Sequence, residues 1–141
     1  LMTFYDHYTV THAKITVTAK NQDSALSQLF GIYVQDNTVA VTDPRVIIEN
    51  GMGVYTQLNT LNSTGDSTQL SHSVNVARWM GRPSILSEDE LRGTNGSNPA
   101  DGLYFHVWAA PISLSNSEAV GINVRVDYTV TFTEPRLIPI S

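Results

Sequence analysis

The sequence predicts an all-β protein, folded as one antiparallel β-sandwich domain over residues 1–141 with one or two short helices in its loops. Apolar and polar residues alternate without interruption over residues 122–133. Turn-forming residues cluster at 62–68 and 93–99. Only 15% of the residues are charged, against a usual ~25%, and Ser, Thr and Asn take their place. A polar but weakly charged surface is typical of turn-rich β structure.

The first element is a long strand over residues 4–20. Its apolar residues occupy even positions at Tyr8 and Val10 and odd positions over residues 13–19. Since alternate residues of a strand face opposite sides, this change of parity predicts a β-bulge near Thr11 or His12.

Three further segments predict strands. Residues 29–35 and 69–77 predict two shorter strands. Residues 103–110 are rich in aromatic and branched side chains and are followed by Pro111. We expect this last strand to be buried on both faces or against a partner subunit.

The alternating segment at residues 122–133 predicts the last strand, which Glu134-Pro135 ends because proline cannot donate to a sheet. Its apolar residues all occupy even positions. We therefore expect one buried face, which includes Val126, Tyr128 and Phe132.

Two short helices are predicted between strands. Asp43 is a good N-cap, Pro44 suits the first helical position, and Gly51 favours a stop. Ser87 and Glu90 have the spacing of a capping box, which predicts one or two helical turns.

Composition excludes several classes of protein. A hydrophobic content of 41% argues against a disordered chain. The absence of cysteine excludes disulfides, thiolate zinc sites and thiol nucleophiles. The net charge of −5 argues against independent nucleic-acid binding. The longest aliphatic run is residues 46–48, so we expect no membrane span, and we expect no secretory signal.

No catalytic, metal or cofactor site is expected. The chain contains no Gly-x-Ser-x-Gly turn. His7 and His12 would stand about 13–16 Å apart along a strand, too far to share one zinc ion. The acidic residues 88–90 suit the first turn of a helix. Asn62 and Asn95 begin Asn-x-Ser/Thr triplets, which we attribute to chance in a chain rich in these residues.

One segment has an unusual composition: in residues 77–83, Ala-Arg-Trp-Met-Gly-Arg-Pro, two arginines flank a tryptophan and a methionine directly after a predicted strand. Trp, Met and Arg are enriched at protein interfaces, and an aromatic ring beside arginine can stack on bases. Trp79 therefore has three interpretations: a plug at the open end of the sandwich, a subunit contact, or a nucleic-acid contact.

Four segments, in this order along the chain, resemble a known family. They are FYDHYTVTHAKITV (4–17), VARWMG (76–81), LYFHVW (103–108) and VRVDYTVTFTEPR (124–136). The pattern is similar to the coat proteins of circovirus-like viruses, which encode a replication initiator and have circular single-stranded DNA genomes.

The resemblance implies a viral single jelly roll that self-assembles into a small icosahedral shell around single-stranded DNA. Its partners would be further copies of itself, the viral DNA and a host receptor that the sequence does not identify. It would be found in the virion and, during assembly, in the host nucleus. The expected contacts with neighbouring subunits or DNA are made by Arg78, Trp79, Arg82, Arg92, Arg125 and Arg136.

The chain departs from this family in two ways. Coat proteins of this group carry an N-terminal basic arm, whereas Lys and Arg total only 8 here and no such run is present. The opening segment resembles a later strand of the family, so the first strands of the jelly roll are also missing. We expect either that the protein continues upstream, with the arm binding the DNA, or that an unrelated chain supplies the missing edge.

Two other classes of function stay open. A carbohydrate-binding or other ligand-binding β-sandwich could stack sugar rings on Tyr55 or Trp79. An accessory β domain of a larger enzyme is the third possibility.

Overall fold

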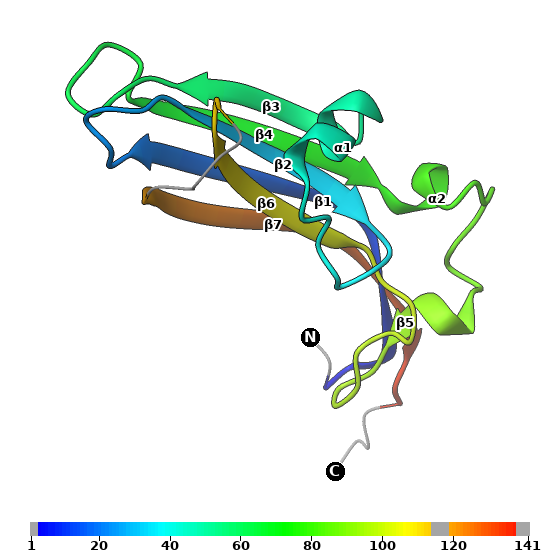
Figure 1. The fold of residues 1–141 in the computed structure, drawn as a ribbon. Helices are drawn as coiled ribbons and strands as arrows, with labels where there is room; N and C mark the ends of the chain where they lie inside the picture. Colours follow the sequence, from blue (N-terminus) through cyan, green and yellow to red (C-terminus); the bar gives the residue numbers. More distant parts are fainter. Residues whose placement is uncertain (1–2, 114–118, 138–141) are drawn as a thin grey trace. The chain divides into compact units, whose positions relative to one another are not determined.

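In the computed structural model, residues 3–113 and 119–137 are described, and strands dominate them (Figure 1). The strands are β1 Tyr5–Asn21, β2 Gln28–Gln35, β3 Gly53–Leu58, β4 Ser67–Asn75, β5 Arg92–Gly93, β6 Tyr104–Pro111 and β7 Val120–Pro135. The helical elements are α1 Pro44–Glu49, α2 Val76–Trp79 and the 3₁₀ turn η1 Asp89–Leu91.

The strands form two antiparallel sheets. One has the order β3-β2-β6, and the other has the order β4-β1-β5, with β7 also paired to β1. The Arg136 amide donates to the Phe4 carbonyl (2.8 Å), and the Gln22 amide donates to the Ala119 carbonyl (3.1 Å). Since β7 thus lies beside β1 near both of its ends, β4 and β5 share the other edge of β1.

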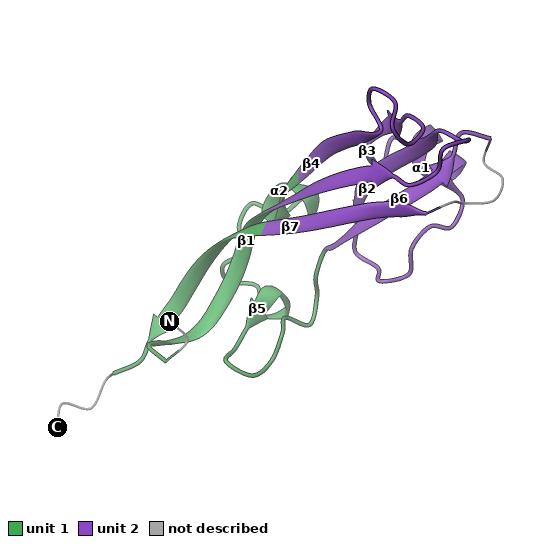
Figure 2. Cartoon of the chain, turned by 90° about the vertical axis from the view of Figure 1, so that its left-hand side faces the viewer, with its two compact units in different colours: residues 1–13, 73–103, 127–141 green, residues 14–72, 104–126 purple. Residues whose placement is uncertain are grey.

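The chain divides into two compact units (Figure 2). Unit 2 comprises residues 14–72 and 104–126, and in it the two sheets stack on a common apolar core. This confirms the predicted all-β antiparallel sandwich. The fully buried members of the core are Ile15, Val17, Ala19, Phe30, Ile32 and Leu58.

Unit 1 comprises residues 1–13, 73–103 and 127–141. Its described part holds the first half of β1, the second half of β7, β5 and α2. A small separate core lies between α2 and the residues that follow it. Its buried members are Val76, Ile85 and Leu91, with Ala77, Met80 and Leu103 packed against them.

Helix α1 forms as its end signals predict. The Asp43 carboxylate accepts from the Arg45 amide at 3.0 Å, and Pro44 is the first helical residue. Gly51 follows with a φ of 59°, a left-handed conformation that glycine adopts without steric cost.

The predicted parity change in β1 is wrong. Buried residues occupy odd positions throughout, from Thr9 through Ala13 to Asn21, whereas Tyr8 and Val10 are only half-buried. The prediction counted only apolar residues, whereas the residue that is buried in the first half of β1 is Thr9. The inference of a bulge near Thr11 or His12 loses its basis.

Several other boundaries differ from prediction. Strand β3 was not predicted at all, because Tyr55 and Gln57 interrupt its apolar pattern. The strand predicted to end at residue 77 stops at Asn75, whose side chain caps α2 instead. Ser87 caps nothing: Glu88 takes the N-cap position of a single 3₁₀ turn and makes no side-chain capping bond.

The predicted buried face of β7 is also wrong in part. Ile122, Val124 and Tyr128 are 53%, 46% and 63% exposed. In unit 2, Val126 packs against the core. In unit 1, the centroid of the Phe132 ring lies 5.5 Å from that of the Tyr5 ring. The alternation identifies a strand and its apolar face, but β7 is an edge strand whose apolar face is only partly covered.

Strand β6 is likewise an edge strand rather than one buried on both faces. Ala110 and Pro111 are buried, but Tyr104 is 42% exposed and the residues between are mostly half-buried. None of the helices found in residues 3–113 and 119–137 has both the length and the apolar character needed to cross a membrane.

Candidate functional site

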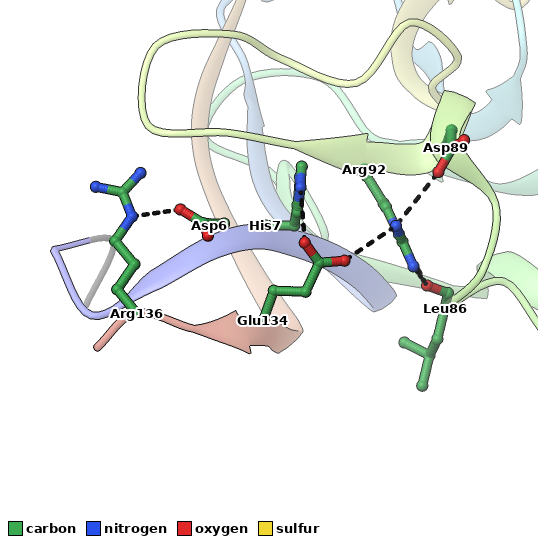
Figure 3. Close-up of polar contacts among 7 residues, drawn as sticks. All are labelled: Asp6, His7, Leu86, Asp89, Arg92, Glu134 and Arg136. Atoms are coloured by element: carbon green, nitrogen blue, oxygen red, sulfur yellow. Dashed lines mark hydrogen bonds and ion pairs between the residues drawn. The ribbon is translucent and has the colours of Figure 1, made fainter.

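All of the predicted contact residues except Arg125 lie in unit 1. Arg92 and Arg136 join a polar cluster around the ends of β1 and β7, which we call the Glu134 cluster (Figure 3). Arg78, Trp79 and Arg82 lie on α2 and the turn after it. Arg125 lies exposed on the part of β7 that belongs to unit 2. The structure therefore separates the predicted residues into three places.

Glu134 is the centre of its cluster. Its Oε2 lies 3.2 Å from Nε2 of His7 on the paired strand β1, and its Oε1 accepts from Nη1 of Arg92 at 3.4 Å. The φ of Glu134 is 58°, in the left-handed region that costs a non-glycine residue about 1–2 kcal/mol. The two side-chain contacts hold the end of β7 in this unfavourable conformation.

The side chain of Arg92, the first residue of β5, holds the preceding segment 86–89 by hydrogen bonds. Its Nε and Nη2 donate to the Leu86 carbonyl at 3.0 and 2.9 Å, and its Nη1 donates to Asp89 at 3.2 Å. Backbone pairing places Arg92 opposite Thr9 of β1. The guanidinium is thus occupied by one carbonyl and two carboxylates, which leaves it poorly disposed to bind phosphate.

Arg136 and Arg82 are also paired with acids. Nε of Arg136 donates to the Asp6 carboxylate, and Nη1 of Arg82 donates to Glu88. Each of these side chains is one-third to one-half exposed, and such surface pairs contribute about 0–1 kcal/mol each. Their main effect is to neutralise arginines that the sequence left as candidate DNA contacts.

Arg78 and Trp79 differ from the other candidates. The Asn75 side chain accepts from the Arg78 amide at 2.9 Å, and its Nδ2 lies 2.7 Å from Nε2 of His12, which anchors α2 to β1. Trp79 is 43% exposed, so its interpretation as a core plug is wrong. Within the described residues the Arg78 guanidinium makes no hydrogen bond or ion pair. The interpretations of Trp79 as a subunit contact and as a nucleic-acid contact both stay open.

Sequence reasoning missed Asp6, His7 and Glu134 as members of a cluster. Asp6-His7 and Glu134-Pro-Arg136 stand at opposite ends of the chain. The pairing of β1 with β7 brings them together. An expectation that the first and last strands pair is the signal that could have placed these residues side by side.

The described residues contain no group of three or more His, Asp or Glu side chains placed to hold a metal ion. Outside the Glu134 cluster, burial lowers the pKa of His72 on β4. The pKa of Asp43 is lowered by the hydrogen bond from the Arg45 amide at the start of α1. The folded state therefore favours the unprotonated form of each of these two side chains.

Comparisons with protein-family models, curated proteins and solved structures find no match to this chain. Its function must therefore be argued from strand order, exposed side chains and charge.

Proposed function

We propose that this chain is a structural subunit of a viral shell, a coat protein with a jelly-roll fold that self-assembles around circular single-stranded DNA. The order of its strands carries the proposal most strongly. Exposed apolar side chains and the pairing of its arginines support it further.

A jelly roll has eight strands, built as two Greek keys. In such a fold the first sheet contains strands one, eight, three and six, and the second contains strands two, seven, four and five. In this chain β1 pairs with β4, β7 and the two-residue β5, and β2 lies between β3 and β6. With β5 set aside, β7-β1-β4 corresponds to strands eight, three and six, and β6-β2-β3 corresponds to strands seven, four and five.

The surface supports a role in assembly. Trp79, Ile122, Val124 and Tyr128 are each more than two-fifths exposed, on a surface with few charges. Of these, Ile122 and Val124 lie two residues apart on one face of β7, and large apolar side chains exposed together in this way mark sites of protein interaction. The core of a protein interface is depleted in charged residues, and only 15% of the residues of this chain are charged.

The charge distribution bears on the DNA. Arg82, Arg92 and Arg136 are each paired with carboxylates, and the net charge is −5. Phosphate contacts would have to displace these acids. We therefore infer that Arg78 and Trp79 are the candidate DNA contact within residues 1–141.

Light scattering coupled to size-exclusion chromatography tests the proposal. We expect the wild-type chain to form assemblies of one defined, large mass, and Trp79→Ala to reduce assembly while its melting temperature changes little. Val39→Ala is the matched control, since Val39 is 69% exposed in a turn. A wild-type chain that stays monomeric at every concentration would contradict the proposal.

One observation favours a second candidate, a carbohydrate-binding module. Tyr55 is 52% exposed, and its ring centroid lies 6.5 Å from that of Trp108 on the outer face of the β3-β2-β6 sheet. Exposed aromatic rings can stack on sugars. Binding to a glycan array that Tyr55→Ala abolishes, by a monomeric protein, would favour this function over the shell.

A further inference from the structure

The sequence contains two Asn-Gly pairs, Asn50-Gly51 and Asn95-Gly96. Asparagine is thermolabile because the backbone nitrogen of the next residue can attack its side-chain amide carbon and release ammonia. Glycine in the next position has no side chain to hinder this approach. The rate of the reaction in a folded protein therefore depends on whether the fold holds the attacking nitrogen and the asparagine in place.

The fold holds the first pair at the end of α1. The Asn50 amide donates to the Val46 carbonyl and the Gly51 amide to the Ile48 carbonyl, each at 3.1 Å. Asn50 has a φ of −83° and a ψ of −2°. A ψ near zero places the Gly51 nitrogen beside the backbone nitrogen of Asn50 and turns it away from the side chain. Attack would require this end of the helix to open.

The second pair is the tip of an exposed turn in unit 1. The Thr94 amide donates to the Ser97 carbonyl at 2.9 Å, and Asn95 and Gly96 lie between these two residues. Residues 94–98 are all exposed. Within the described part of the chain, neither the Asn95 side chain nor the Gly96 amide makes a hydrogen bond. A Cβ atom built on Gly96 would meet nothing within 4 Å, so the tip has room to rearrange.

We propose that Asn95 is a site of spontaneous deamidation in the folded protein, whereas α1 protects Asn50. The Gly96 nitrogen gives up its proton to water and attacks Cγ of Asn95. A new C–N bond closes a succinimide ring, and the side-chain nitrogen of Asn95 takes up a proton and leaves as ammonia. Water then opens the ring. Breaking the new C–N bond gives aspartate, and breaking the original peptide C–N bond gives isoaspartate.

The modification changes the charge of the chain. Either product carries a carboxyl group with an ordinary pKa of about 3–4, so it is ionised at neutral pH. Each conversion adds one negative charge to a chain whose net charge is −5. Since the Asn95 side chain has no hydrogen bond to lose and lies at an exposed tip, we expect the melting temperature to stay unchanged. This inference does not depend on the proposed shell.

Peptide mass spectrometry with fragmentation tests the inference, because it locates each conversion of an amide to an acid. The purified chain is kept folded at mildly alkaline pH and sampled over time. We expect Asn95 to deamidate about tenfold or more faster than Asn50, since the hydrogen bonds at the end of α1 must break before Asn50 reacts. In urea, where neither pair is held, the two rates should converge.

Gly96→Ala is the matched variant. Its methyl group should slow deamidation at Asn95 by hindering the attacking nitrogen, while the rate at Asn50 stays as in wild type. An Asn95 that persists in the folded chain as long as Asn50 overturns the inference, as does unchanged deamidation of Asn95 in Gly96→Ala. A difference between the two sites that stays the same in urea would come from the flanking sequence and would overturn the protection assigned to α1.

Discussion

The indole ring of Trp108 lies directly over Gly31 on the outer face of the β3-β2-β6 sheet. A Cβ atom built on Gly31 would stand 2.5 Å from Cε2 of that ring. Register places Trp108 and Tyr55 opposite Gly31 on the strands either side of it. Glycine at this position lets an edge-strand tryptophan cover the central strand of the sheet.

Replacing Gly31 with alanine should therefore destabilise the protein by about 1–3 kcal/mol, the usual cost of overpacking. Urea unfolding measures this change. Gly96→Ala is the control, because a Cβ there meets nothing within 4 Å, and it should cost about 0.5 kcal/mol or less. Equal stability of the two variants would show that Trp108 does not occupy this place.

At Glu134, glycine should be more stable than alanine by about 1 kcal/mol, because both lose the contacts with His7 and Arg92 but only glycine relieves the left-handed backbone. At Thr131, an ordinary position of the same strand, the order should reverse, since glycine weakens a strand interior. Thermal unfolding of the four variants makes the comparison. If glycine and alanine rank in the same order of stability at both positions, Glu134 does not have a left-handed backbone.

Two isoleucines distinguish the buried core of unit 2 from the exposed face of β7. Ile32 is fully buried, and Ile32→Ala should cost about 2–5 kcal/mol. Ile122 is 53% exposed, and Ile122→Ala should cost about 1 kcal/mol or less in the dilute monomer. Chemical denaturation at low protein concentration gives both values. A large loss at Ile122 would mean that the face of β7 is covered after all.

His72 should make stability depend on pH. Burial lowers its pKa below the ordinary 6.5, so the folded state binds fewer protons than the unfolded state near and below that pH. Stability is then fully present above about pH 6.5 and falls as the pH is lowered. An NMR titration of the His72 ring should give a midpoint below 6.5, and His72→Gln should remove this part of the acid loss. A midpoint at or above 6.5 would contradict the burial.

The sequence predicted local structure where local signals decide it. The alternation in β7, the capping residues of α1 and the branched residues of β1 each specify their element through neighbouring residues. Strand β3 escaped prediction because Tyr55 and Gln57 place large polar-ended side chains on its outer face. Its identity as a strand comes from pairing with β2, which local sequence does not encode.

Long-range relationships could not be predicted in this way. The contact of His7 with Glu134 needs the register between the first and last strands. The exposure of Tyr128 depends on whether another strand covers β7, and an apolar alternation predicts the face without predicting its cover. For Trp79 the sequence allows a core plug as one of three interpretations, whereas the short helix α2 leaves its side chain 43% exposed.

Electron microscopy of the purified chain tests the shell proposal most directly. We expect closed, hollow particles of one uniform diameter, which Trp79→Ala depletes without unfolding the protein. Fields that contain only small, separate molecules at high concentration, from a chain that is folded by circular dichroism, would contradict the proposal that this protein builds a shell.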